Sequence, residues 1–320
     1  MADSLKRSIQ TSKPGLNFGI EHDHQAIRCA RLSTDGRGSH TVDRLEEVKG
    51  DFSEDISLLD GFRKIKSLMG INARDSVVAC LSGKQVYASQ ISFRKLGSEE
   101  MEQALRLELR KTVHFEVATS TLDYEVLDED EGSSGGLAQV MIALASNSLL
   151  NRHLNLMEKA GLRAVAVDVL PIAIANALWA WKGGQEGDYP MVALHVGPQV
   201  STIVIDCEHA PFFNRNVYFA AEDVFGANAS PGDREKRIHS LADEISRSLL
   251  YYEKNSEASG FREVLLLGEY LDQEQMINKI HTVTGLPVTK MDLAGQLGSL
   301  REEAAGRFDL AVALALRGEL

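Results

Sequence analysis

Two segments of the chain share one pattern: an apolar run, a short polar turn and a second apolar run. The first segment is residues 16–32, with its turn at Glu21–Gln25, and the second is residues 191–206, with its turn at Gly197–Gln199. Apolar runs rich in Val, Ile and Ala on either side of a short turn predict β-hairpins. Because one hairpin opens each half of the chain, the pattern indicates an internal duplication with a cleft between the halves.

Outside the hairpins, apolar stretches typical of strands alternate with stretches that have the 3.6-residue period of helices. Gly70, Gly161 and Gly285 follow three of the helical stretches, where glycine commonly ends a helix. This alternation predicts a mixed α/β architecture with layered sheets. The expected strands are 40–48, 77–81, 86–93, 121–127, 139–145, 164–169 and 264–267, and the expected helices are 56–69, 98–111, 149–160, 171–181, 234–254, 273–284 and 310–316.

Two polar stretches interrupt this alternation. Residues 182–188 are Gly-rich and directly precede the second hairpin, so they are the best candidate for a linker between the two halves. Residues 128–136 combine acidic residues with Ser and Gly and lie between two expected strands. We expect them to form a mobile hairpin tip.

Composition supports a soluble protein with two lobes. The chain has 320 residues and a mass of 35.1 kDa, which exceeds a typical compact domain, and 44% of its residues are hydrophobic and 25% charged. No run approaches the roughly 18 apolar residues that cross a bilayer. The first 13 residues are polar, unlike a signal peptide. We therefore expect a cytoplasmic location.

Charge and cysteine content exclude several classes of protein. A formal net charge of -12 repels nucleic acids and anionic lipid, so any membrane association would run through a protein partner. Cys29, Cys80 and Cys207 are isolated, and we expect reduced, buried side chains rather than disulfides or a zinc site. The chain contains neither a Gly-x-x-x-x-Gly-Lys phosphate loop nor a His-Glu-x-x-His helix.

Six segments in chain order carry a resemblance to a known family. They are Gly19–Glu21, Glu99–Glu108, Leu122–Leu127, Ala160–Leu162, Ala242–Tyr252 and Ala313–Arg317. Together they resemble the PilM family, cytoplasmic actin-like proteins of type IV pilus assembly that are related to the cytoplasmic domain of GspL and to FtsA. The resemblance implies an α/β, actin-like fold, which is a duplicated ribonuclease H-like fold, with an inserted subdomain of the FtsA and PilM type. It places the first lobe at 14–188 with the insertion at about 85–166, the second lobe at 189–306, and a C-terminal helix within 307–320 that returns to the first lobe.

The resemblance also implies a binding function. Such proteins act as scaffolds of a type IV pilus or related type II secretion platform, and they bind the short N-terminal cytoplasmic tail of a PilN-like bitopic membrane protein. The tail would lie in a groove between the first subdomain and the insertion, and the residues implied for its wall are Leu105, Leu109, Val113 and Phe115. The alternative is that these side chains fill the core between helix and sheet. Contacts with other platform or motor proteins and homo-oligomer formation stay open.

In actin-like proteins the two hairpin turns and nearby residues hold ATP. The corresponding positions here are Gly19, Glu21, His195, Gly197, Glu244, Ser248 and Gly268. Glu244 and Ser248 share one helical face, which could line a cleft. The same spacing also fits the solvated face of an amphipathic helix.

The turn residues are unusual for nucleotide binding. A phosphate-binding turn needs glycines, hydroxyl groups and a short carboxylate for magnesium. The first turn has no glycine or hydroxyl, while His195 stands where the family has Asp and Pro198 has no N–H to donate. We therefore predict degenerate or absent nucleotide binding and no enzymatic activity, with ATP and Mg²⁺ as ligands only if the degenerate site still binds them. The alternative is an actin-like ATPase whose nucleotide state regulates pilus assembly. We expect the polar residues of the first turn, His22–His24, to be exposed rather than to bind a metal.

Overall fold

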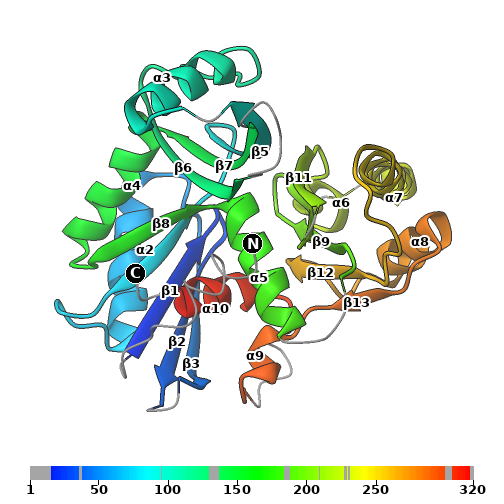
Figure 1. The fold of residues 1–320 in the computed structure, drawn as a ribbon. Helices are drawn as coiled ribbons and strands as arrows, with labels where there is room; N and C mark the ends of the chain where they lie inside the picture. Colours follow the sequence, from blue (N-terminus) through cyan, green and yellow to red (C-terminus); the bar gives the residue numbers. More distant parts are fainter. Residues whose placement is uncertain are drawn as a thin grey trace.

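The computed structural model describes residues 16–35, 38–94, 96–129, 137–183, 188–208, 210–226, 229, 231–299 and 305–317. Within these residues the strands form two five-stranded sheets and one three-stranded sheet. The two larger sheets lie on either side of a central group of helices, and the three-stranded sheet lies beside the first of them (Figure 1). The mixed α/β architecture predicted from the pattern is confirmed.

The first lobe is built on the sheet β3-β2-β1-β4-β8. Three antiparallel strands come first: β1 (Leu16–His22), β2 (Ala26–Thr34) and β3 (His40–Lys49). Two strands run parallel to β1: β4 (Val77–Leu81) and β8 (Ala164–Val169). Because successive side chains point to opposite faces, each strand contributes to two helical layers. One face packs against α2 (Asp55–Met69) and α4 (Asn147–Lys159), and the other against α5 (Leu170–Lys182) and α10 (Asp309–Leu316).

The second lobe repeats this plan on the sheet β11-β10-β9-β12-β13. Its strands are β9 (Met191–Val196), β10 (Ser201–Cys207), β11 (Ala210–Val217), β12 (Val264–Gly268) and β13 (Val288–Lys290). The outer face packs against α7 (Pro231–Asn255) and α8 (Glu274–Thr284), and the short helices are α6 (Ala221–Phe225) and α9 (Leu293–Gln296). Both sheets have a three-stranded antiparallel meander followed by two parallel strands in the same spatial order. This confirms the predicted internal duplication.

The two lobes share a core formed around α5 and α10. These helices have apolar residues on all sides, which is the pattern of a helix surrounded by protein. Their side chains belong to one buried cluster with residues from the first sheet, such as Val78, and from the second sheet, such as Leu265. In Figure 1 both helices lie between the two sheets. The lobes are therefore joined by a continuous hydrophobic core as well as by the chain.

The insertion is a separate small layer of sheet and helix. Its sheet has the order β5-β7-β6, with β5 (Val86–Arg94), β6 (Ser120–Glu129) and β7 (Leu137–Ser146), and α3 (Ser98–Leu109) covers one face. α4 and β8 follow β7 but pack with the first lobe. The expected insertion at about 85–166 therefore extends some way past this separate sheet. The expected hairpin tip lies mostly at residues 130–136, outside the described residues, as do 184–187 of the expected linker.

The sequence pattern missed two strands and two short helices, all in the second half. β11 begins with Ala210 and Pro211 and has no apolar alternation, whereas β13 is only three residues long. The helices α6 and α9 have five and four residues, too few to show a helical period. Among the described residues, no helix is long and apolar enough to cross a membrane.

Candidate functional site

Three charged residues lie side by side across the first sheet, next to the first hairpin turn. Strand pairing sets Glu21 of β1 opposite Arg28 of β2, and Arg28 opposite Glu47 of β3. Directly paired residues of neighbouring strands point to the same face of a sheet. The register of the meander therefore places a guanidinium between two carboxylates, on the side of the sheet that meets the second lobe.

Arg28 is the centre of a larger ion cluster. Its Nη1 lies 3.1 Å from Oε1 of Glu21 and 3.5 Å from Oδ2 of Asp23, and its Nε donates to Oε1 of Glu47 at 3.0 Å. Nη2 contacts the carboxylate of Glu269, which follows β12 in the second lobe. The Arg28 side chain is only 2% exposed. One buried cation is therefore shared by four carboxylates from both lobes.

Arg307 provides a second cation at this site. Its Nη2 donates to both carboxylate oxygens of Glu47, at 2.7 and 2.9 Å. Burial raises the pKa of Glu21, and the neighbouring carboxylates of Asp23 and Glu47 act in the same direction against the lowering effect of Arg28. The two guanidinium groups thus face four carboxylates, which leaves the site negative when all of them are ionised.

The first turn is closed by its own aspartate. Oδ1 of Asp23 accepts hydrogen bonds from the backbone N–H groups of Gln25 at 2.6 Å and Ala26 at 2.9 Å. Such a side-chain-to-backbone arrangement satisfies the donors that a turn would otherwise present to a ligand. Nε2 of His24 donates a 3.0 Å hydrogen bond to Oε2 of Glu222 in α6, so the turn also touches the second lobe. Instead of the exposed turn that we expected, residues 22–25 are half-buried.

His22 is held by aromatic contacts within the first lobe. Its ring stacks on His153 of α4 with a centroid separation of 5.1 Å, and both rings meet the edge or face of Phe62 at nearly right angles. Burial lowers the pKa of His22 and lowers that of His153 to about 3, so both imidazoles are neutral at physiological pH. The described residues contain no group of three or more His, Cys, Asp or Glu side chains placed to hold a metal ion.

The second turn presents a histidine to the same site. Burial lowers the pKa of His195 to about 4, with Asp23 opposing and Arg28 assisting this shift, and its Nδ1 has no hydrogen-bond partner. His195 is thus close enough to both residues of the first hairpin to interact electrostatically. The two turns therefore face each other across the lobes, as the resemblance implied, but the second contributes a neutral imidazole and no carboxylate.

The glycines near the turns are explained by backbone packing. A Cβ on Gly19 would collide with the carbonyl oxygen of Ala311 in α10, and one on Gly197 with the carbonyl oxygen of Val200 in its own turn. Gly268 has a φ of 107° and lies against the backbone of Val196. These three positions require glycine for the fold whether or not a phosphate is bound.

Two other predicted nucleotide positions make contacts along α7. Glu244 pairs with Arg215 of β11 at 3.2 Å and with Arg247 at 2.7 Å. The Ser248 hydroxyl is buried and donates to the carbonyl oxygen of Glu244 at 2.7 Å. Their partners lie on α7 and on the edge strand β11, separated from β12 and Gly268 by two strands of the sheet. None of the contacts found for Glu244 and Ser248 joins them to the two hairpin turns.

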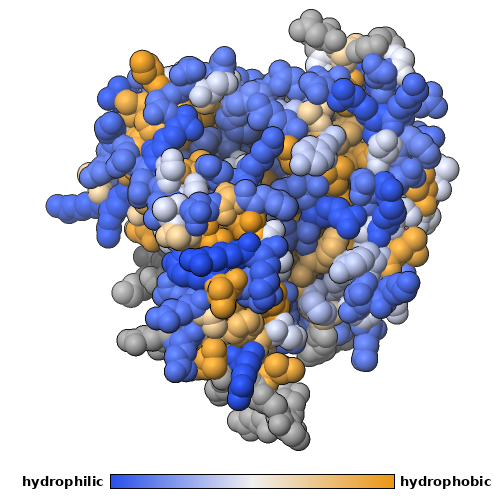
Figure 2. Space-filling model, turned by 90° about the horizontal axis from the view of Figure 1, so that it is seen from above, coloured by the Kyte–Doolittle hydropathy of each residue, from blue (hydrophilic) through white to orange (hydrophobic). Residues whose placement is uncertain are grey.

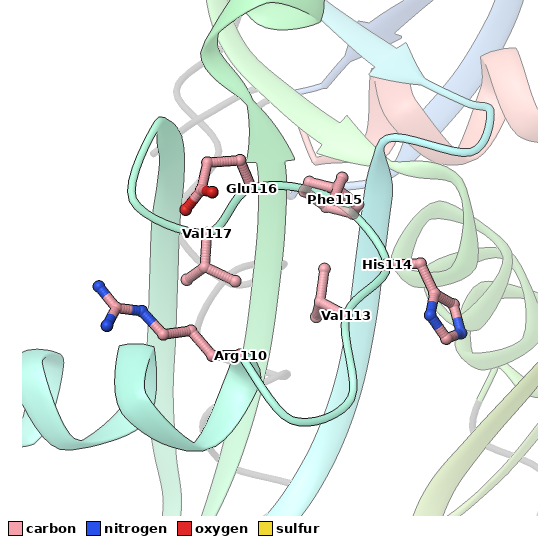
Figure 3. Close-up of a pocket in the computed structure, with 6 residues that line it drawn as sticks. All are labelled: Arg110, Val113, His114, Phe115, Glu116 and Val117. Carbon is pink, nitrogen blue, oxygen red and sulfur yellow. The ribbon is translucent and has the colours of Figure 1, made fainter.

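The predicted partner-binding residues divide into two groups. Leu105 and Leu109 of α3 are 0% and 2% exposed and fill the core between helix and sheet, as the alternative interpretation held. Val113 and Phe115 lie in the loop after α3 and line a pocket of about 650 Å³ together with Arg110, His114, Glu116 and Val117. Figure 3 shows Val113 and Val117 inside the curl of this loop and His114 pointing away from it.

Sequence reasoning missed three residues of the ion cluster: Glu47, Glu269 and Arg307. Glu47 lies opposite Arg28 only because a register shift between Arg31 and Leu32 moves the pairing of β2 with β3 by one residue, so counting back from the turn would have set Glu46 there. Glu269 follows Gly268 directly, but nothing in the local sequence marks it as a partner of Arg28. Arg307 lies far from the hairpins in sequence, and no local pattern marks it.

One family model matches the chain, and the solved structures share its fold. The sequence model of the family described as type IV pilus assembly protein PilM matches residues 19–225. Comparison with curated proteins found no significant match. Among solved structures, a PilM–PilN type IV pilus biogenesis complex has a TM-score of 0.77 at 21% identity, covering 94% of this chain and 98% of that chain. The ethanolamine utilization protein EutJ from Carboxydothermus hydrogenoformans has a TM-score of 0.51 at 11% identity, covering 99% and 95%. At these identities the structural likeness shows the fold, which is the actin-like α/β fold.

Proposed function

The chain belongs to the PilM family of type IV pilus assembly proteins, and from this premise we propose that it is a scaffold that binds the cytoplasmic tail of a PilN-like membrane protein. The observation that carries the proposal is the extent of the family match. Residues 19–225 include nearly all of the first sheet and the whole inserted sheet, which belong to the two units between which the tail is expected to bind. Through this partner the protein would sit at the inner membrane.

The pocket in the loop after α3 is the candidate for the insertion's side of the tail-binding groove, because its lining residues all lie between Arg110 and Val117. Val113 and Phe115 are half-buried there, so each offers apolar surface to a ligand while still packing on the insertion core. Arg106 of α3 holds the loop by donating from Nη1 to the carbonyl oxygens of Val117 and Ser120, both at 3.0 Å. Seen from above, this face of the molecule is mostly hydrophilic with separate apolar patches (Figure 2). A pocket with fixed walls and a few apolar side chains suits a short extended peptide.

Binding can be measured with the PilN-like protein of the same organism in detergent. We expect the wild-type chain to bind it and Phe115→Ala to weaken binding by about tenfold, the effect of losing an aromatic anchor. Leu107→Ala is the matched control, because Leu107 is 62% exposed on α3 but does not line the pocket. Equal affinity of both variants would place the tail elsewhere on the protein. No binding by the wild-type chain would contradict the scaffold function itself.

The proposed scaffold works without a bound nucleotide. The residues at the two turns do not suit a polyanionic ligand, because four carboxylates surround the one buried cation and Asp23 already occupies the backbone donors of the first turn. A phosphate group entering this site would meet like charge and few free donors. The replacement of a turn carboxylate by neutral His195 also removes one expected contact to magnesium.

Calorimetric titration with Mg-ATP tests this part of the proposal. We expect no binding heat and no thermal shift at millimolar nucleotide, since a ligand of the native state raises the melting temperature. The double variant His195→Asp, Glu21→Asp restores the family carboxylates, and we expect it to stay inert because Arg28 and Glu269 still fill the site. Saturable binding by the wild-type chain would favour the alternative, an actin-like protein regulated by ATP.

A further inference from the structure

We infer that the Arg28 cluster is a built-in clasp that holds the two lobes together in the absence of any nucleotide. The clasp consists of Arg28, Glu21 and Glu47 on the first sheet, Glu269 on the second lobe, and Arg307 on the segment that leads into α10. It is a property of this chain alone and does not depend on a membrane-protein partner.

The first-lobe half of the clasp is fixed by strand pairing. Glu21, Arg28 and Glu47 lie on three consecutive strands and are directly paired across them. Both carboxylates bind the guanidinium within 3.1 Å, which leaves its second terminal nitrogen, Nη2, directed away from them. A planar guanidinium held on two sides presents its remaining N–H groups in a fixed direction.

The second-lobe half is positioned by the end of β12. The backbone N–H of Glu269 donates to the carbonyl oxygen of Val196 at 2.8 Å, and Gly268 donates to Gly306 at 2.8 Å. The next residue, Tyr270, has a φ of 56°, which is rare for an aromatic residue. Such a conformation persists only where the surroundings impose it, and it turns the chain so that Glu269 meets Nη2 of Arg28.

Arg307 adds a second link through the same carboxylate that binds Arg28. It donates to both oxygens of Glu47 and also lies 4.0 Å from Glu269. Glu47 is therefore bound by cations from two directions, which makes the cluster a connected network rather than a set of isolated pairs. Such a network contributes more to stability than the same ion pairs would if each were isolated on the surface. Replacing one of its residues also leaves the charges of the others without a full set of partners.

The clasp differs in burial from the contact between His24 and Glu222, which also joins the lobes. The side chain of Glu269 is 20% exposed and that of Arg28 is 2% exposed. The side chain of Glu222 is 47% exposed. Water screens an exposed pair far more than a buried one, so the closed arrangement of the lobes should depend on Glu269 and hardly at all on Glu222.

The test measures the separation of the lobes with spin labels. Cysteines replace Lys64 on α2 and Gln275 on α8, which are exposed, while the three native cysteines are buried and should not take up label. We expect one narrow distance distribution in the wild-type background, unchanged by Mg-ATP. Glu269→Gln should add a population at longer distance, and Glu222→Gln should not.

Hydrogen exchange gives an independent measurement on the unlabelled protein. Losing the charge of Glu269 should speed exchange of the Glu269 and Arg28 backbone amides about tenfold, which corresponds to about 1.4 kcal/mol of local opening free energy. Glu269→Gln keeps the shape of the side chain, so a folded variant is expected and circular dichroism can verify it. Distances and exchange rates equal to those of the wild-type chain would overturn the clasp. Equal opening in Glu222→Gln would also overturn the clasp, because the buried cluster would then hold the lobes together no better than the exposed pair of His24 and Glu222.

Discussion

Replacement of Arg28 by Met tests how much the buried cation contributes to stability. The Arg28 side chain is 2% exposed and contacts the carboxylates of Glu21, Asp23, Glu47 and Glu269, so solvent cannot easily replace it. Removing one partner of a buried ion pair costs about 3–5 kcal/mol, because the remaining charges stay buried without compensation. Met keeps much of the apolar stem, so most of the loss is electrostatic. We expect Arg28→Met to lower the free energy of unfolding by about 3–5 kcal/mol at pH 8.

The size of this loss should depend on pH in a defined direction. Burial already raises the pKa of Glu21, and Arg28 is the cation that opposes the shift. Without Arg28 the pKa of Glu21 rises further. A carboxyl group whose pKa is higher in the folded than in the unfolded state destabilises the protein most at a pH above the folded-state pKa, and the penalty shrinks as the pH falls through the folded-state pKa towards the unfolded-state value. The difference between variant and wild-type chain should therefore be smaller at pH 5 than at pH 8.

The assay is urea unfolding followed by the fluorescence of Trp179 and Trp181. Arg31→Met is the matched control on the same strand, because Arg31 is 29% exposed and pairs only loosely with Asp43 at 3.7 Å. We expect it to change the free energy of unfolding by no more than about 1 kcal/mol. Adding Glu21→Gln to Arg28→Met should recover part of the loss. Equal stability of Arg28→Met and Arg31→Met at pH 8 would contradict the stabilising role of the buried cation. So would a loss of unfolding free energy in Arg28→Met that is the same at pH 5 as at pH 8.

Two further predictions concern packing and acid stability. Gly19→Ala should destabilise the protein by about 1–3 kcal/mol, because the new Cβ meets the backbone of α10. Gly232→Ala is the control: Gly232 lies in open space in the first turn of α7, so this change should be neutral or slightly stabilising. Thermal melts compare the two variants, and equal melting temperatures would contradict the packing argument. Burial lowers the folded-state pKa of His195 to about 4, below the ordinary value of 6.5. The neutral imidazole therefore favours the folded state above pH 6.5. This contribution to the free energy of unfolding, about 3 kcal/mol, is lost as the pH falls towards 4. The free energy of unfolding of the wild-type chain and of His195→Gln, compared at pH 7 and at pH 4.5, measures this contribution. An imidazole that titrates near pH 6.5 in the folded protein would refute the prediction.

The sequence was most informative where a physical pattern is local. The two hairpins were visible because each combines apolar runs with a short turn, and α2 was visible because its apolar period ends at Gly70. The helix at the C-terminus was predicted from its apolar run, and the structure explains that run by burial between two sheets. Short elements such as β13 were missed, because three residues cannot display a period.

The candidate site was harder to predict because its residues come together only through long-range structure. The sequence showed that the turns lack glycine and hydroxyl groups, but not what takes the place of a ligand there. Arg28 follows the first turn within an apolar strand, and nothing in the local sequence marks it as the centre of an ion cluster. The role of Arg28 depends on the strand register, which sets Glu47 opposite it, and on the packing of the second lobe, which places Glu269 against its guanidinium group. Neither relation can be read from spacing along the chain.

The retained glycines and the buried arginine carry different weight as evidence about a nucleotide. Gly19 and Gly268 are required because backbone from α10 or from β9 lies where a Cβ would be, so they would be needed in this fold with or without ATP. The presence of these two glycines therefore favours neither a protein that binds ATP nor one that does not. Arg28 has no such requirement, because a sheet of this topology does not need a buried cation at that position. A buried charge is stable only with partners that compensate it, and here those partners are four carboxylates that a phosphate would have to displace or neutralise. The charges where Arg28 meets Glu269, rather than the glycines around them, are therefore the stronger argument for the proposed clasp.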